Sequence, residues 1–482
     1  MPRSAVPLFC LALVLGACNL APDYHPPLVE VPANYKEAGP WRPAAPSDDA
    51  PRGAWWARFG DPTLDKLEPR IETANPDLAA TVARYDQARA FASEAASGLD
   101  PQVSLGASLS ANRQSASRPL RGATQPNFYG ANQAAASVGY EIDFWGKLRN
   151  EAKAGSELAQ ASAADLATMR LSLQSDLATD YLTLRGLDAD AKLLTDTVGA
   201  YQKALDLTQT LFQGKIVSSL DVSRAQTQLD TAQAQLSEIA SKRALMEHAV
   251  ATLVGQPAGS FAIPADVPSF TLPSVPSSVP STLLQRRPDI AAAERTVAAA
   301  NSEIGVARAA FYPSISLNLL AGFQSSGLNL LSLPDSFWSV GPDVTLPLFD
   351  GGKLDAEEAI AYARFREAGA DYRSTVLAAF QQVEDNLALL HWLGQEASDE
   401  AAGVAAAQHT LDVALNLYKQ GVSSYLEVVT AQTALLQAQQ TLLDLQTRRL
   451  GADVGLIRGL GGGWQETDLP TEAAASKPTA AS

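Results

Sequence analysis

The sequence has few side chains of the kinds that bind metals or carry out redox chemistry. Its 482 residues include only two cysteines and four histidines. The histidines, which are His25, His248, His391 and His409, do not stand at a spacing typical of metal ligands. A Gly-x-Ser-x-Gly nucleophile motif and a glycine-rich phosphate-binding loop are also absent. We therefore expect a protein that is not an enzyme and has no catalytic residue, no cofactor and no metal site.

Positive charge is also scarce. Lysine and arginine number 36 against 52 aspartates and glutamates, which gives a formal net charge of −16. Because an acidic chain repels phosphate groups, nucleic acid is excluded as a partner. The chain is long enough for several ordinary domains, and its content of alanine, leucine, glutamine and serine favours long helices.

The first 17 residues have the features of an export signal. Arg3 supplies a positive start, and the apolar run Val6–Leu15 is too short to span a bilayer as a permanent helix. The tetrapeptide LGAC, which ends at Cys18, matches the lipobox pattern, in which the signal is cut before the cysteine and the thiol is lipidated. We expect this processing at Cys18; the alternative is an ordinary cleaved signal with a chance cysteine. Cys10 leaves with the signal, so the mature chain cannot form an internal disulfide.

The chain contains an internal repeat. The segment SSLDVSRAQTQL (218–229) recurs as SYLEVVTAQTAL (424–435), and WGKL (145–148) recurs as GGKL (351–354). Each copy has the order helix, two alternating strands, long helix, tight break and long helix, and a proline-rich segment separates the copies. The expected segments are a signal 1–17, an extended anchor segment 18–62, a first repeat 63–255, a linker 256–282, a second repeat 283–464 and a disordered C-terminal tail 465–482.

A seven-residue period runs through the last long helix of each copy. In the first copy the apolar seam passes Val222, Leu229 and Leu236 and is interrupted at Arg243, and Arg449 interrupts the second copy in the same way. A period of seven predicts coiled-coil packing. The span between the glycines near 146 and 214 would reach ~100 Å if it were helical throughout, which compact domains rarely need.

Four segments alternate with period two, typical of strands that have one apolar face. They are VSLGASLSA (103–111), AAASVGYEIDF (134–144), 315–323 and 340–348. Each is close to the roughly 9 to 11 residues that a transmembrane strand requires. The pattern leaves open a soluble sandwich, which would bury the apolar face. Four strands cannot close a barrel and lipid does not tolerate an open sheet edge, so a chain that spans a membrane in this way must oligomerise.

Four motifs resemble one known family. They are the segment Leu283–Leu317, GYEIDFWGKLR (139–149), WWARFGDPTLDKL (55–67) and LGGGW (460–464). Together they resemble the TolC-like outer membrane efflux proteins, in particular the lipoprotein branch that serves resistance-nodulation-division (RND) pumps. The resemblance implies a mixed α/β membrane protein, in which a trimer builds a twelve-stranded outer membrane β-barrel from four strands per chain. A long periplasmic α-helical barrel continues that β-barrel.

The resemblance also implies roles near the two helix breaks, where the family has a closed periplasmic iris. Asp221 and Tyr418 match positions whose side chains pair across neighbouring helices, and Glu427 matches a pore-facing acid. Asp221 has the alternative interpretation of a helix cap. A periplasmic adaptor protein is expected to contact the helix tips at Gly214, Val217, Ser218, Gly421, Val422 and Ser423.

The two tips differ in sequence. Gly214 and Gly421 are expected to permit the tight turns between helices. The first tip has one more residue between its glycine and the following leucine than the second. Ser423 stands where some relatives carry an arginine in the closing network.

The sequence therefore predicts a passive, ATP-independent exit duct for small molecules in the outer membrane of a Gram-negative bacterium, lipid-anchored and extending into the periplasm. Its expected partners are two further copies of itself, a periplasmic adaptor, an inner membrane RND pump and outer membrane lipids. One alternative is a structural coiled-coil envelope lipoprotein, which would not need membrane-length strands. Another is the same duct serving a protein secretion system.

Overall fold

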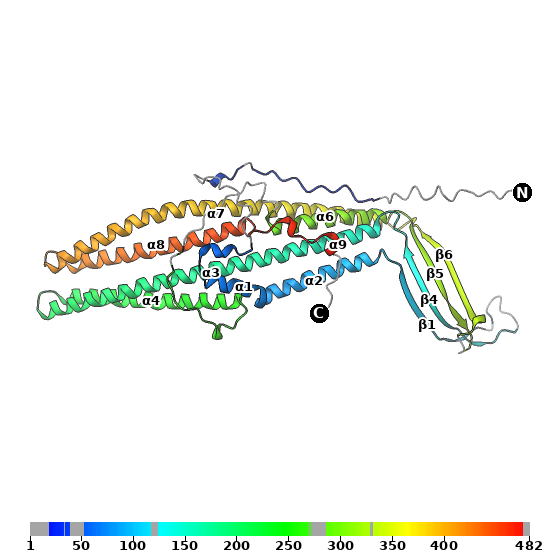
Figure 1. Ribbon diagram of the computed structural model, residues 1–482, viewed down its shortest axis with the longest axis horizontal. Coiled ribbons are helices and arrows are strands. Elements are labelled where there is room, and N and C mark those ends of the chain that lie inside the picture. The colour runs from blue at the N-terminus through cyan, green and yellow to red at the C-terminus, as the bar shows by residue number, and fades with distance from the viewer. Residues whose placement is uncertain are drawn as a thin grey trace.

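The computed structural model describes residues 19–32, 34–38, 53–115, 117, 124–268, 270, 286–327 and 331–475. The expected signal 1–17 and the expected lipidation site Cys18 lie outside the described residues. The molecule is elongated, with long helices at one end and an antiparallel sheet at the other (Figure 1). Within the described chain, none of the helices is both long and apolar enough to cross a membrane.

The helices reproduce the internal repeat. The α-helices are α1 Leu64–Ala74, α2 Pro76–Ser97, α3 Lys147–Gln213, α4 Ser219–Leu253, α6 Pro288–Ala309, α7 Lys353–Lys419, α8 Tyr425–Gly459 and α9 Glu472–Ala475. Helices α3 and α7 have 67 residues each, and α4 and α8 have 35 each. At a rise of about 1.5 Å per residue, α3 and α7 are each ~100 Å long. The expected pair of long helical hairpins is therefore present.

Local sequence explains where these helices begin. Proline occupies the first position of α2 and of α6, where its missing N–H is not needed. Gly146 and Gly352, which precede α3 and α7, have left-handed φ angles of 77° and 88°. Because glycine reaches this conformation without steric cost, the repeated Gly-Lys-Leu sequence marks the change from strand to long helix in both copies.

The sheet combines strands from both repeats. Its order is β1 Gln102–Ser108, β4 Asn132–Glu141, β5 Ser314–Ser325 and β6 Ser336–Thr345, with every neighbouring pair antiparallel. The short strands β2 Ala111–Arg113 and β3 Phe128–Gly130 form a separate ladder. The four expected period-two segments therefore form one sheet.

Three strand ends differ from the sequence-based expectation. Strand β1 ends at Ser108 rather than continuing to 111, and Ala111 begins the separate strand β2. Strand β6 ends at Thr345 rather than continuing to 348, because Pro347 has no N–H to donate to a ladder. Strand β4 ends at Glu141, because the chain then turns toward α3. That turn is held by Asp143, whose carboxylate accepts hydrogen bonds from the backbone N–H and the Nε of Arg149 at 3.0 and 2.9 Å.

Buried apolar clusters join segments that lie far apart in the chain. The largest cluster packs the aromatic side chains of the 3₁₀ helix η3 (Trp55–Phe59) and α1 against α3, α4 and α8. A second joins α6, α7 and α8, and a third lies under the two helix tips. The packing of α4 against α3 and of α8 against α7 agrees with the heptad seams.

The N-terminal segment lies along the outside of the helices. Residues 19–32 run beside α6 and α7 in an extended conformation (Figure 1). Asn301 Nδ2 donates to the carbonyl oxygen of Pro22 at 2.9 Å, and the Tyr24 hydroxyl donates to Glu294 at 2.5 Å. Farther along, Glu384 accepts the backbone N–H groups of the 3₁₀ helix η2 (Lys36–Ala38).

The expectation of a disordered C-terminal tail is wrong for residues 465–475. They form the 3₁₀ helix η6 (Glu466–Asp468) and the short helix α9. Gln160 Nε2 donates to the carbonyl oxygen of Pro470 at 3.0 Å, and Leu469 packs beside Ala164. Ala475 is buried against alanines of α2 and α3. The remaining residues of the expected tail, 476–482, lie outside the described residues.

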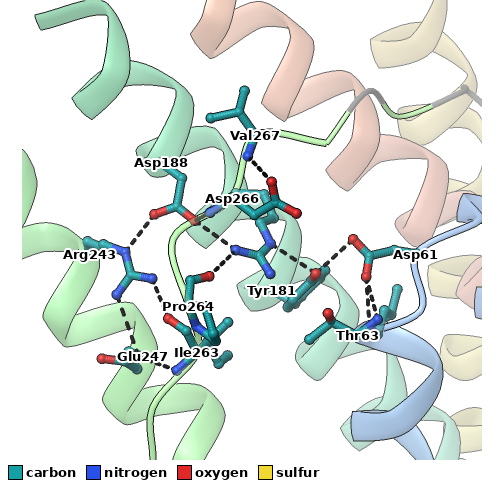
Figure 2. Close-up of polar contacts among 12 residues, drawn as sticks. Asp61, Thr63, Tyr181, Asp188, Arg243, Glu247, Ile263, Pro264, Asp266 and Val267 are labelled. Atoms are coloured by element: carbon teal, nitrogen blue, oxygen red, sulfur yellow. Dashed lines mark hydrogen bonds and ion pairs between the residues drawn. The ribbon is translucent and has the colours of Figure 1, made fainter. Parts of the chain in front are cut away.

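A buried polar network holds the first hairpin to the turn before α1, at Asp61, and to the start of the linker (Figure 2). Asp188 on α3 accepts from Arg185 at 2.9 Å and from Arg243 on α4 at 2.6 Å. Arg185 also donates to the Tyr181 hydroxyl, which donates to Asp61 at 2.7 Å. The arginine that interrupts the heptad seam of α4 is therefore an ion-pair partner of α3.

The linker completes this network through its backbone. Pro264 offers its carbonyl oxygen to Arg185, and Ile263 offers its carbonyl oxygen to Arg243 (Figure 2). The backbone N–H of Asp266 donates to Asp188 at 3.2 Å. These contacts fix the start of the linker against α3 and α4.

Candidate conduit wall and periplasmic gate

One face of the sheet is apolar and uncovered. Leu105, Ala136, Ala321 and Trp338 lie opposite one another across the four strands, and Val103, Val138, Leu319 and Val340 form the next row on this face. Leu105 is 84 % exposed and Trp338 is 75 % exposed. A soluble sandwich would bury such a face against a second layer, so the structure does not support that alternative. An exposed apolar band on a membrane-length sheet is suited to contact lipid.

The opposite face of the sheet is rich in polar and small residues. Ser104, Ser137 and Ser339 share a row with Leu320, and the Oγ atoms of Ser104 and Ser137 lie 2.6 Å apart. Another row places Glu141 and Asp343 on either side of Ser316. This arrangement is suited to line an aqueous conduit.

The sheet of one chain is open at both edges. Strand β1 pairs only with β4, and β6 pairs only with β5, among the described residues. Each edge therefore presents backbone N–H and C=O groups without a ladder partner, which would be costly in lipid. The single chain is an incomplete membrane wall.

Aromatic side chains mark the junction between the strands and the helices. Trp145 follows β4, Tyr312 precedes β5, and their rings stack with centroids 4.7 Å apart. The Trp145 Nε1 donates to the carbonyl oxygen of Pro313 at 2.8 Å. Paired tryptophan and tyrosine rings at the end of a membrane-length strand are typical of a membrane–water interface.

The two helix tips have the same length but use different turn residues. The residue with a left-handed backbone conformation is Gly421 in the second tip, with φ 74°. In the first tip it is Lys215, with φ 59°. Gly214 has φ −72°, so the expectation that it supplies the first turn is wrong. The glycine is displaced by one position, which explains the apparent extra residue between it and Leu220.

Asp221 lies at the N-terminus of α4, where its carboxylate acts locally. It accepts from the Ser218 backbone N–H at 3.4 Å and from the Ser218 hydroxyl at 3.2 Å, and Arg224 lies 3.6 Å away. Ser218 and Asp221 thus form a capping box. Within the described chain no hydrogen bond joins Asp221 to Tyr418.

Tyr418 lies at the C-terminal end of α7, and its side chain is buried. Its ring centroid is 5.1 Å from that of Tyr425. Burial raises the pKa of Tyr418, and the charge of Asp221 raises it further, so the two groups are within electrostatic range. Glu427 is exposed on the first turn of α8. The structure therefore brings Asp221 and Tyr418 to the same end of the helices and leaves Glu427 free to face solvent.

The expected adaptor-contact residues differ in exposure. Val422 is 70 % exposed, whereas Val217 is partly buried against the cluster under the tips. Ser423 lies inward, and its hydroxyl has no hydrogen-bond partner in the described chain. The most exposed apolar side chain of the first tip is Ile216, at 71 %. Ile216 was not among the expected contact residues, although it aligns with Val422 in the internal repeat.

Comparison with known proteins agrees with this geometry. The sequence model of the outer membrane efflux protein family matches residues 69–256 and 279–462. The chain is 32 % identical over 475 residues to the antibiotic efflux pump outer membrane protein ArpC of Pseudomonas putida, covering 97 % of each chain. It is 31 % identical over 474 residues to the pyoverdine export outer membrane protein OpmQ of Pseudomonas aeruginosa, covering 96 % of this chain and 98 % of OpmQ.

Solved structures show the same fold. The outer membrane protein VceC of Vibrio cholerae superimposes with a TM-score of 0.80 at 30 % identity, covering 86 % of this chain and 100 % of VceC. The outer-membrane channel OprN superimposes with a TM-score of 0.83 at 27 % identity, covering 93 % and 100 %. With its sheet open at both edges, its paired long hairpins and these matches over nearly its whole length, the chain belongs to the outer membrane efflux protein family.

Proposed function

We propose that three copies of this chain close head to tail into a passive duct across the outer membrane. The observation that carries the proposal is the incomplete wall, since one chain has two open sheet edges and a bare apolar face. Three chains with four strands each would give a twelve-stranded barrel with no edge in lipid. An inner membrane RND pump, acting through a periplasmic adaptor, would deliver small molecules to this duct.

The helices support the same closure because they form an arc with two unlike edges. Near the sheet the packing order is α2, α3, α6 and α7, and near the tips it is α4, α3, α8 and α7. Helix α7 therefore lies at one edge, where it exposes Leu389 and Trp392. Helices α2 and α4 lie at the other edge, where they expose Phe91 and Leu245. Apolar edges of different composition suit a heterologous interface that closes into a ring.

The small-molecule cargo is supported by the relatives. ArpC is named for antibiotic efflux and OpmQ for pyoverdine export. A structural spacer lipoprotein would not need an exposed apolar sheet of membrane length. The exposed Ile216 and Val422 would give an adaptor apolar contacts at the helix tips, beside Gly214, Ser218 and Gly421.

We infer that Cys18 carries a lipid. The residue after it, Asn19, accepts a hydrogen bond from Asn150 Nδ2 at 2.9 Å. Asn150 lies in the first turn of α3, next to the sheet. A lipid on Cys18 would therefore be attached close to the expected membrane surface. Intact-mass analysis of the purified chain would show acyl chains that Cys18→Ser lacks; an unmodified wild-type cysteine would exclude the anchor.

We further propose that Asp221 and Tyr418 help to hold the periplasmic end closed and that Glu427 faces the pore. A shielded carboxylate–hydroxyl hydrogen bond contributes roughly 1.5 to 3 kcal/mol. We expect Asp221→Ala combined with Tyr418→Phe to raise single-channel conductance in planar bilayers severalfold. Glu427→Gln should reduce cation selectivity, measured as the reversal potential in a salt gradient, with a smaller change in conductance.

Ser218→Ala is the matched control for the gate experiment. It removes the hydroxyl that donates to Asp221 but leaves the carboxylate and the backbone N–H of residue 218 in place. It should therefore conduct like the wild type. A double variant with wild-type conductance, together with an unmoved reversal potential for Glu427→Gln, would refute the gate assignment. Absence of any channel from the wild-type protein would refute the duct.

A further inference from the structure

A cavity between α3, α7 and α8 has a composition that the duct does not explain. It has a volume of about 290 Å³ and lies in the half of the molecule that leads to the tips. Leu411, Leu415 and Leu436 contribute to its apolar lining. Its size is close to the lower end, roughly 300 Å³, of the cavities that hold small ligands.

Three of the polar residues that line this cavity are two lysines and a buried glutamine. Lys203 of α3 and Lys419 of α7 are exposed, and neither forms an ion pair with any described residue. Gln432 of α8 is only 5 % exposed, and its Oε1 accepts no hydrogen bond within the described chain. A buried amide oxygen without a donor is costly, so a hydrogen-bond donor that reached Gln432 would be favourable.

The internal repeat shows that the two lysines of this cavity are not inherited from the fold. In the aligned repeats Lys203 corresponds to His409 and Lys419 corresponds to Gln213. The apolar lining changes only in part, because Leu415 corresponds to Gln209 and Leu436 to Asp230, whereas Leu411 corresponds to Leu205. Gln432 corresponds to Gln226. The two lysines are thus the feature that the helix scaffold has in one place only.

We propose that this cavity binds a small amphiphile with an anionic group, an apolar body and a hydrogen-bond donor. The apolar body would occupy the leucine lining, where its burial is favourable. The anionic group would lie between Lys203 and Lys419, for which the structure shows no ion pair among the described residues. A hydroxyl or amide N–H of the ligand would donate to Gln432. The inference rests on the proposed duct, because it places a binding site for one class of cargo in the duct's helical wall.

Binding of radiolabelled cholate tests the proposal. Cholate combines a carboxylate, hydroxyl donors and an apolar body, and it can be used below its critical micelle concentration. The full-length protein in lipid nanodiscs would be dialysed to equilibrium against cholate, and uptake by empty nanodiscs subtracted. We expect saturable binding that weakens at least about tenfold in Lys203→Gln combined with Lys419→Gln. Gln432→Leu should weaken it severalfold.

Lys192→Gln combined with Lys242→Gln is the charge-matched control. These lysines are exposed on α3 and α4, where they pair with Asp196 and Glu238. The control should bind cholate like the wild type, and all variants should keep wild-type conductance. Equal weakening by both lysine pairs would overturn the site, because it would assign binding to net charge.

Two further outcomes separate this inference from the duct itself. A wild-type protein that conducts but shows no saturable cholate binding refutes the amphiphile site alone. The amphiphile site is refuted even if Lys203→Gln combined with Lys419→Gln impairs pumping, because that result would assign the cavity to a protein partner. A protein that binds cholate but never conducts refutes the duct, on which the cargo interpretation depends.

Discussion

Asp188→Ala is expected to lower the free energy of unfolding by about 3–5 kcal/mol, the usual cost of removing one partner from a buried ion pair. The Asp188 side chain is 1 % exposed and bridges two arginines, Arg185 and Arg243, on different helices. Without it the Arg185 guanidinium remains buried with only neutral partners, Tyr181 and Pro264. Thermal unfolding of the purified protein, followed by circular dichroism, measures the loss.

Asp196→Ala is the control on the same helix. Asp196 pairs with Lys192 at 3.0 Å, but both side chains are more than half exposed. Exposed pairs contribute about 0–1 kcal/mol, so this variant should unfold close to the wild type. Equal destabilisation by the two variants would show that the network in Figure 2 does not hold the first hairpin.

Glu68→Gln is expected to stabilise the protein, and more so as the pH rises. Glu68 is fully buried in α1, and neither carboxylate oxygen has a hydrogen-bond partner in the described chain. Burial raises the pKa of Glu68 from 4.5 to about 9, so the folded protein holds a proton that the unfolded chain releases. Stability must therefore fall as the pH rises from 4.5 toward 9, by at most about 1.4 kcal/mol per pH unit from this group.

The free energy of unfolding of the wild type and of Glu68→Gln, measured between pH 5 and pH 8.5, tests this effect. The excess stability of the glutamine variant should grow as the pH rises, because glutamine does not titrate. Glu72→Gln is the control, since Glu72 is partly exposed and pairs with Arg170 at 2.6 Å. It shows how loss of an exposed, paired carboxylate from the same helix affects stability. A difference in free energy of unfolding between Glu68→Gln and the wild type that stays constant across this pH range would contradict a buried, protonated Glu68.

Periodicity and repetition were sufficient to predict most of the fold. The period of two located the strands β1, β4, β5 and β6, and the repeated glycines located the starts of α3 and α7. These features depend on local geometry, which neighbouring residues determine. Strand ends were less predictable, because β4 ends where Asp143 meets Arg149.

Features that depend on contacts between distant segments could not be predicted. Arg243 appeared only as an interruption of a seam, and its partner Asp188 lies on another helix. The tail was expected to be disordered, yet Leu469 and Ala475 have apolar neighbours on other elements.

The candidate gate was located by resemblance, and the structure refines its geometry. The left-handed turn at Lys215 was missed because glycine was taken as the residue that enables it. Lysine adopts this conformation only when the surrounding turn requires it, and the repeat position of Gly421 would have indicated that requirement. Cross-helix pairing of Asp221 and Tyr418 stays a prediction, because it depends on neighbouring helices in the assembled duct.

Native mass spectrometry of the detergent-extracted protein tests the central claim most directly, namely that one chain is an incomplete wall that closes with copies of itself. The account predicts one predominant species with the mass of three chains, each beginning at Cys18 and bearing acyl groups. A predominant monomer that retains its strand content by circular dichroism would contradict it, because the edges of β1 and β6 would then be stable without a partner.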